Sequence, residues 1–221
     1  MEHIVKILEI HKVTHNVKSF RFEKPANYMF TLGQATDVSV NKEGWEKEIR
    51  PFTFTSLNEY PYLEFTIKRY ESHNGVTNQV HLLKEGDELI IRDVWGAIEC
   101  KGAGWFIAGG AGITPFIAIL RQLYKDDKLK GNKLLFSNKT EADIIYRDEL
   151  SHMLGNDFIN ILTDEKNGKY ENGRIDKAFL KKEIPDFSKH FYVCGPDKMI
   201  ADVNSILNDL GAVPDNVVFE K

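Results

Sequence analysis

Segments in which apolar and polar residues alternate dominate the first half of the chain, and this alternation predicts half-buried β-strands. Glycine, asparagine and proline residues separate the segments, as expected for tight connections between strands. Strands at such close spacing favour a small antiparallel barrel, and Val76–Leu83 is predicted to interrupt it as a helix. The predicted strands are His3–Val13, Val17–Glu23, Ala35–Val40, Leu63–Arg69 and Glu88–Arg92.

In the second half, apolar runs typical of buried strands alternate with helical stretches, which predicts a parallel sheet with helices on both faces. The clearest helix is Asp197–Leu210, whose apolar positions follow helical spacing and which Gly211 ends. The predicted strands of this half are Trp105–Ala108, Lys133–Ser137, Phe158–Thr163, Phe191–Cys194 and Asn216–Phe219.

This change of pattern divides the chain into two predicted domains. We expect a β + α/β fold, with an antiparallel β-barrel over residues 1–100 and a parallel-sheet α/β domain over residues 101–221. The boundary is expected near Cys100–Gly104, where two glycines loosen the chain.

Composition narrows the class of protein. Of the 221 residues, 42% are hydrophobic and 28% charged, as in ordinary globular proteins, and a net charge of −4 argues against a nucleic-acid binder. With two cysteines, Cys100 and Cys194, this chain alone cannot build a disulfide framework, a zinc cluster or an iron–sulfur site from its thiolates, and no metal site is predicted. Free cysteines and the lack of a signal peptide lead us to expect a cytoplasmic protein.

One stretch raises the question of a membrane span. Residues 102–120 carry no charge, which is nearly the length that crosses a bilayer. The stretch contains five glycines and Pro115, however, and its flanks fit a strand, a turn and a helix better. We therefore expect no membrane association.

A glycine turn lies within this stretch, where Gly109, Gly110 and Gly112 follow a predicted strand and precede a predicted helix. Glycines let backbone N–H groups approach an anion, and a helix N-terminus adds a favourable dipole, so the turn suits a phosphate. Thr114 is expected to cap the helix and Pro115 to take its first position. A tight turn without a ligand explains the same pattern equally well.

Arg50, Pro51, Phe52 and Thr53 form a second candidate segment. In a strand, Arg50 and Phe52 point to one side, while Pro51 and Thr53 point to the other. Arginine suits a diphosphate through its bidentate fork, and an aromatic ring suits the face of a flat heterocycle. The competing interpretation, a barrel strand with Phe52 and Phe54 in the core, is favoured by the pattern alone.

A third candidate, Cys194-Gly195-Pro196, follows another buried strand and precedes a helix. In an open α/β sheet, ligands bind outside the carboxyl ends of the strands, so this turn and the first glycine turn are expected at one edge. The alternative for Cys194 is a small buried apolar residue, as most free cysteines are.

Taken in order along nearly the whole chain, these motifs resemble the ferredoxin–NAD(P)H reductase superfamily. The resemblance rests also on Leu32-Gly33-Gln34, Gly75-Val76-Thr77 and Gly86-Asp87. It implies a flavin-binding barrel domain over residues 1–100 and an NAD(P)-binding domain over residues 101–221.

The resemblance also implies roles for the barrel residues. Arg50 matches an arginine on the flavin diphosphate, Phe52 replaces the usual tyrosine on the flavin ring, and Thr53 matches the hydroxyl residue near flavin N5. Gly75, Val76 and Thr77 match a second diphosphate-binding turn, which favours FAD, although some relatives use FMN. Phe219 loosely matches an aromatic residue that covers the flavin ring.

In the second domain, the resemblance implies that Gly109–Pro115 binds the diphosphate of NADH or NADPH. Cys194, in its turn with Gly195 and Pro196, matches a cysteine beside the nicotinamide at hydride transfer. Asp164 and Glu165 follow the strand at whose end NADPH-using relatives carry serine and arginine, so NADH is the expected donor. Four nearby residues could instead bind the 2′-phosphate of NADPH and argue against this preference: Lys139, Lys166, Lys169 and Tyr170.

The predicted function is therefore that of a flavoprotein reductase in which a hydride from NAD(P)H reaches the flavin and electrons pass on to a separate acceptor, such as flavodoxin or ferredoxin. One alternative is a reductase of free flavin. Another is a non-catalytic nucleotide-binding module with a regulatory role, because fold resemblance does not establish activity.

Overall fold

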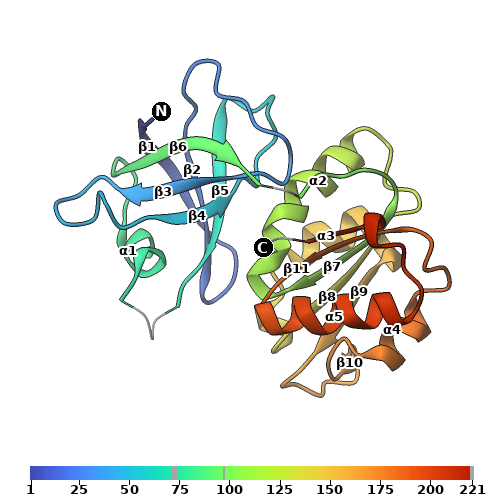
Figure 1. Ribbon diagram of the computed structural model, residues 1–221. Helices are drawn as coiled ribbons and strands as arrows, with labels where there is room; N and C mark the ends of the chain where they lie inside the picture. The colour runs from blue at the N-terminus through green and yellow to red at the C-terminus, as the bar shows by residue number, and fades with distance from the viewer. Residues whose placement is uncertain (71–73, 97, 220–221) are drawn as a thin grey trace. The chain divides into compact units, whose positions relative to one another are not determined.

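The computed structural model describes residues 1–70, 74–96 and 98–219, without the side chains of Pro214 and Phe219. The chain separates into two compact units, Met1–Gly96 and Ala97–Lys221 (Figure 1). The division falls just before the Cys100–Gly104 segment, where the sequence pattern changes.

The first unit is a six-stranded antiparallel sheet with the strand order β4-β3-β6-β1-β2-β5. Its two edge strands, β4 and β5, meet through an isolated bridge between Phe54 and Phe65, which closes the sheet into a barrel. Aromatic and β-branched side chains fill the interior, and Val76 and Val80 of α1 join them. The elements are β1 (His3–Lys12), β2 (Val17–Glu23), β3 (Ala35–Val40), β4 (Arg50–Thr53), β5 (Tyr62–Lys68), α1 (Val76–Leu82) and β6 (Glu88–Trp95).

The second unit is a six-stranded parallel sheet with the order β10-β9-β8-β7-β11-β12. Helices α4 and α5 cover one face, and α2 and α3 cover the other (Figure 1). The strands are β7 (Gly104–Gly109), β8 (Lys133–Asn138), β9 (Phe158–Leu162), β10 (Glu171–Asn172), β11 (His190–Cys194) and β12 (Val217–Phe219). The helices are α2 (Thr114–Lys125), α3 (Arg147–Leu154), α4 (Lys177–Glu183) and α5 (Asp197–Asp209).

These two sheets confirm the predicted β + α/β fold. Every residue of β7 is buried, as expected for a central parallel strand covered on both faces, which explains its continuous apolar run. The uncharged stretch 102–120 is divided into β7, a 3₁₀ turn over Gly110–Ile113 and α2. Among the described residues, no helix is both long enough and apolar enough to cross a bilayer.

A tyrosine holds the segment that enters the second unit. The Tyr192 hydroxyl of β11 accepts hydrogen bonds from the amides of Lys101 and Gly102, both at 3.0 Å, and donates to the Gly102 carbonyl at 2.8 Å. Burial raises the pKa of Tyr192 to about 12, so the hydroxyl keeps its proton at neutral pH. This side chain therefore anchors the start of the parallel sheet.

Candidate functional site

Arg50 opens the edge strand β4 with an exposed side chain. Its guanidinium donates one hydrogen bond, from Nη1 to the Ile49 carbonyl at 3.1 Å. Within the described part of the chain, Arg50 forms no ion pair with a carboxylate, whereas Arg21, Arg92, Arg121 and Arg147 each form at least one. An exposed guanidinium with most of its donors free is suited to bind a phosphate or diphosphate.

The rest of β4 shows a gradient of burial. Pro51 is exposed, Phe52 is half-buried and Thr53 is buried. The Phe52 ring packs on the barrel core, with its centroid 5.8 Å from that of Phe65, and part of its surface stays accessible. Phe54 belongs wholly to the core, where it stacks on Phe30 at 4.3 Å. The core interpretation therefore holds for Phe54, while Phe52 combines core packing with an accessible face.

The turn at Gly75 begins α1, which contacts β3, the strand that pairs with β4. Gly75 is the N-cap residue, and a Cβ at this position would meet open space. Val76 is buried in the barrel core and Thr77 is half-buried. The two segments predicted to bind the flavin diphosphate thus lie on two elements, β4 and α1, that both contact β3.

In the second unit, the two glycine turns follow neighbouring strands, because Ala108 of β7 pairs with Cys194 of β11. The turns touch each other closely. A Cβ on Gly109 would lie 2.4 Å from Met199 Sδ, and one on Gly195 would lie 3.2 Å from the Gly109 amide nitrogen. Close packing therefore explains why Gly109 and Gly195 lack side chains, independently of any ligand.

Gly110 differs from its neighbours, because its φ of +53° lies in the left-handed region and a Cβ there would meet no atom within 4 Å. Packing therefore does not explain the glycine at this position, whereas the left-handed backbone conformation does.

The expected cap at Thr114 is wrong. A 3₁₀ turn over Gly110–Ile113 leads directly into α2, so Thr114 is the first helical residue, Ile113 is the N-cap, and Pro115 is the second residue of the helix. The Thr114 hydroxyl donates to the Ala111 carbonyl at 3.0 Å. The continuous turn leaves no extended residue at position 114, which a side-chain cap requires.

Cys194 ends β11 and is buried, with 5% of its surface exposed. This burial fits the small apolar residue that the pattern allows, and the thiol lies where β11 leads into Gly195 and Pro196. Phe219 lies in β12 and its backbone pairs with Val193, but its side chain lies outside the part of the structure that is described.

Asp164 lies two strands away from β7 at the same carboxyl edge, after the end of β9. Its side chain is exposed and its amide donates to the Lys139 carbonyl at 2.9 Å. The structure therefore places Asp164 on the predicted edge of the sheet, at a distance from the two glycine turns that touch.

Sequence reasoning missed a charged network beside Asp164. Glu141 Oε1 lies 2.6 Å from Lys169 Nζ and 3.1 Å from Arg147 Nη1. The hydrogen bond from Lys169 is the main cause that lowers the pKa of Glu141. Asn167 bridges Glu141 and Glu165 at 3.0 Å to each. The only sequence signal was the pair Thr140 and Asp143, which forms a capping box and places Glu141 in a turn after β8.

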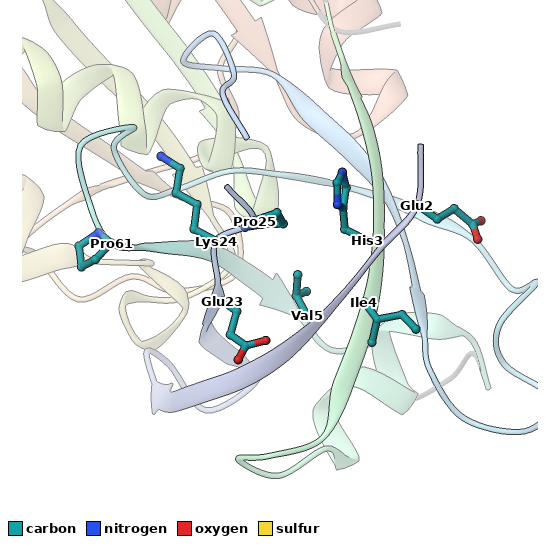
Figure 2. A pocket seen from close by; sticks show the side chains of 8 residues that line it. All are labelled: Glu2, His3, Ile4, Val5, Glu23, Lys24, Pro25 and Pro61. Carbon is teal, nitrogen blue, oxygen red and sulfur yellow. The ribbon is translucent and has the colours of Figure 1, made fainter. Parts of the chain in front are cut away.

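A hollow of about 580 Å³ opens on the first unit, and Figure 2 shows the side chains that line it. They come from the start of β1, from the end of β2 and the two residues after it, and from Pro61 before β5. Its charged residues are engaged elsewhere, since Glu2 pairs with Arg92 at 2.8 Å and the Lys24 ammonium donates to the Asn58 carbonyl. No residue predicted for the site lines this hollow, so we assign it no role.

Comparison with known protein families agrees with the two units. Residues 4–99 match the family of oxidoreductase FAD-binding domains, and residues 106–205 match the family of oxidoreductase NAD-binding domains. The first range covers most of the first unit and extends three residues beyond its end at Gly96, and the second range lies within the second unit.

Individual proteins resemble the chain over most of its length. NADH-cytochrome b5 reductase 2 of Lodderomyces elongisporus is 30% identical, over 95% of this chain and 77% of that protein. The glycine betaine monooxygenase reductase subunit of Pseudomonas aeruginosa is 29% identical, over 95% of this chain and 61% of that protein.

A crystal structure with bound FAD and NADP, a ferredoxin NADP+ reductase from Neisseria gonorrhoeae, shares the fold with a TM-score of 0.86. It is 20% identical, and the match covers 99% of this chain and 98% of that one. The resemblance predicted from the sequence motifs is thereby confirmed. The chain belongs to the ferredoxin–NAD(P)H reductase superfamily, as an NAD(P)H-dependent, flavin-containing reductase.

Proposed function

We propose that this reductase uses NADH, holds FAD in residues 1–100, binds the nucleotide in residues 101–221 and reduces a separate one-electron carrier protein. Bound FAD accepts the two electrons of a hydride together and releases them singly. The observation that carries the proposal is the exposed guanidinium of Arg50, next to half-buried Phe52 on an edge strand.

The barrel residues have separate roles in this proposal. Arg50 binds the diphosphate through its guanidinium fork, and Phe52 offers the accessible part of its ring to the flavin. Pro51 lies between them, and Thr53 supplies a hydroxyl near flavin N5. The turn of Gly75, Val76 and Thr77 supplies backbone N–H groups to the diphosphate, and two such segments favour FAD over FMN.

The second unit binds and orients the nucleotide. The backbone of Gly109, Gly110 and Gly112 binds its diphosphate at the start of α2, with Thr114 and Pro115 in the first turn of that helix. Cys194, Gly195 and Pro196 position the nicotinamide for hydride transfer. Asp164 binds the free ribose hydroxyl of NADH and repels a 2′-phosphate.

The acceptor is proposed to be a small one-electron carrier protein. The sequence resemblance pointed to flavodoxin or ferredoxin, whereas one relative is named for cytochrome b5 and another for a glycine betaine monooxygenase. The chain carries two cysteines, too few for a four-cysteine iron–sulfur cluster of its own. We therefore propose cytochrome b5, ferredoxin and flavodoxin as the acceptors to compare.

Arg50 argues against the free-flavin alternative, because a dedicated diphosphate contact favours a flavin that stays bound. The retained Cys194 turn argues against a non-catalytic module, which has no need to position a nicotinamide. Flavin binding by Arg50 and positioning of the nicotinamide by Cys194 are proposed for different domains, so each role can be tested by its own variant.

The test is a visible spectrum of the purified protein after gel filtration, followed by mass spectrometry of the flavin released by heat. We expect a yellow protein that carries FAD and oxidises NADH with ferricyanide. A colourless protein that reduces added flavin would support the free-flavin alternative. A protein that oxidises NADH neither with ferricyanide nor with added flavin would support the non-catalytic binding module.

A further inference from the structure

The barrel of the first unit closes at a seam directly after the proposed flavin segment. The isolated bridge between Phe54 and Phe65 joins the two edge strands there. The Thr55 amide donates to the Glu64 carbonyl at 2.8 Å, and the Glu64 amide donates to Ser56 Oγ at 3.0 Å. The position of β4 relative to β5 therefore depends on contacts centred on Glu64.

Glu64 is a carboxylate inside this seam, with 3% of its surface exposed. Its Oε1 accepts a hydrogen bond from the Thr55 hydroxyl at 2.9 Å, and Thr55 Oγ1 lies 3.1 Å from Thr66 Oγ1. An ionised carboxylate only accepts, so Thr55 must donate to Glu64, and Thr66 must then donate to Thr55. The carboxylate thus orders both hydroxyl groups in one direction.

The second carboxylate oxygen is bound from the other side. Glu64 Oε2 accepts from Arg21 Nε at 3.2 Å, and the Arg21 guanidinium lies over the Tyr62 ring at 4.7 Å. Arg21 also pairs with Glu9 at 2.8 Å. A buried carboxylate requires such compensation, because removal of its partners leaves an uncompensated charge in the protein interior.

We propose that Glu64 is a positioning residue of the flavin site, an inference that rests on the proposed function of Arg50–Thr53. Glu64 is linked to this segment through two of its neighbours. Thr55, which it binds, follows Thr53 by two residues, with Phe54 between them. Phe65, its neighbour in β5, packs against Phe52 with the ring centroids 5.8 Å apart.

Two substitutions interrupt these links without a large change of volume. Glu64→Gln leaves one acceptor oxygen for two donors, so either Thr55 or Arg21 faces an amide NH₂ group. Thr55→Val removes the hydroxyl and keeps the shape, which makes it the decisive variant where Glu64→Gln does not fold. Thr55→Ser restores the hydroxyl, and Glu9→Gln removes the other partner of Arg21 without touching the seam.

The measurement is FAD affinity, obtained by titration of the apoprotein, together with the visible spectrum and midpoint potential of the bound flavin. We expect each of Glu64→Gln and Thr55→Val to weaken FAD binding about tenfold, because a displaced β4 places Arg50 and Phe52 less well for the flavin. The double variant should lose little more than either single one, because both break the same contact. Thr55→Ser and Glu9→Gln should bind FAD as the wild type does.

A purely structural role predicts a lower melting temperature with unchanged FAD affinity, spectrum and potential, and that result would overturn the proposal. Additive losses in the double variant would also overturn it. The variant Arg50→Ala tests the proposed flavin segment itself, and so distinguishes an error in that assignment from an error in the role of Glu64. If Arg50→Ala keeps full FAD affinity, the flavin segment is misassigned, whereas its loss beside unaffected seam variants rejects only the role of Glu64.

Discussion

A Cβ placed on Gly112 would lie 2.4 Å from the carbonyl oxygen of Cys194, so at this point the two turns of the second unit touch through backbone atoms. This contact joins the end of β11 to the turn after β7. The position of the Cys194 turn is therefore coupled to the proposed nucleotide-binding backbone.

Gly112→Ala is expected to push the two turns apart, because 2.4 Å is far shorter than any stable contact between a methyl group and a carbonyl oxygen. Overpacking of this kind costs about 1–3 kcal/mol. The free energy of unfolding, measured with urea, should fall by that amount, and binding of ADP-ribose should weaken. Wild-type stability of Gly112→Ala would contradict the close contact.

Arg50→Ala should purify with clearly less flavin while staying folded. The lost contact to a diphosphate is charge-assisted and contributes about 1.5–3 kcal/mol. Arg50→Lys should recover only part of this, because an ammonium lacks the bidentate fork. The ratio of flavin absorbance to protein absorbance measures the occupancy. The control is Lys47→Ala, which removes an exposed positive charge from the preceding loop and should retain full flavin. Full flavin occupancy in Arg50→Ala would contradict the assignment of Arg50 to the diphosphate.

Cys194→Ser should leave FAD binding nearly intact, because Cys194 lies in the second unit. It should slow reduction of the flavin by NADH, since a small displacement of the nicotinamide is costly for hydride transfer. Stopped-flow absorbance at the flavin band gives this rate directly. Cys100→Ser is the matched control, because Cys100 lies at the start of the second unit, where the chain approaches Tyr192. A wild-type rate in Cys194→Ser would leave Cys194 with a packing role alone.

His81 predicts how stability depends on pH. Burial lowers its pKa below the ordinary value of 6.5, against the hydrogen bond between Nε2 and the Ile67 carbonyl at 2.8 Å. The unfolded chain therefore binds more protons than the native state between the folded pKa and 6.5, and stability falls as pH decreases through this window. Thermal unfolding between pH 7.5 and 5, at intervals of about half a unit, should show this loss. His81→Gln should flatten the curve, while exposed His11→Gln should keep it.

The sequence predicted most of the fold, because alternation and apolar runs report which faces of β1–β3 and of β7–β9 are buried. The sequence did not predict features that depend on contacts with another part of the chain. Strand β6 continues past the predicted end at Arg92, because Ala35 of β3 still pairs with Trp95. Lys169 joins Glu141 and Arg147 from 28 residues beyond Glu141, and no local pattern reports such a contact. The Thr114 cap was wrong because a 3₁₀ turn leads directly into α2 and leaves no extended residue at position 114.

The proposed preference for NADH depends on charges at the carboxyl edge of β8 and β9. Two carboxylates, Asp164 and Glu165, oppose a 2′-phosphate there. Of the nearby cations that could attract it, Lys169 and Arg147 both pair with Glu141, at 2.6 Å and 3.1 Å, whereas Lys139 and Lys166 are exposed. We therefore expect a higher kcat/KM for NADH than for NADPH, measured with ferricyanide at low salt.

Glu141→Gln should release these two cations and improve binding of a 2′-phosphate. Ion pairs at the protein surface contribute little, so the affinity for 2′,5′-ADP relative to ADP should rise only about two- to fivefold. Calorimetric titration of both ligands measures this ratio without hydride transfer. Glu171→Gln removes the same charge from β10, where the carboxylate pairs with Lys182, and should leave the ratio unchanged. An equal rise in both variants would mean that net charge, rather than the pairing of Lys169 and Arg147 with Glu141, governs the choice of nucleotide. A wild-type preference for NADPH would instead mean that Lys169 and Arg147 leave Glu141 when the nucleotide binds.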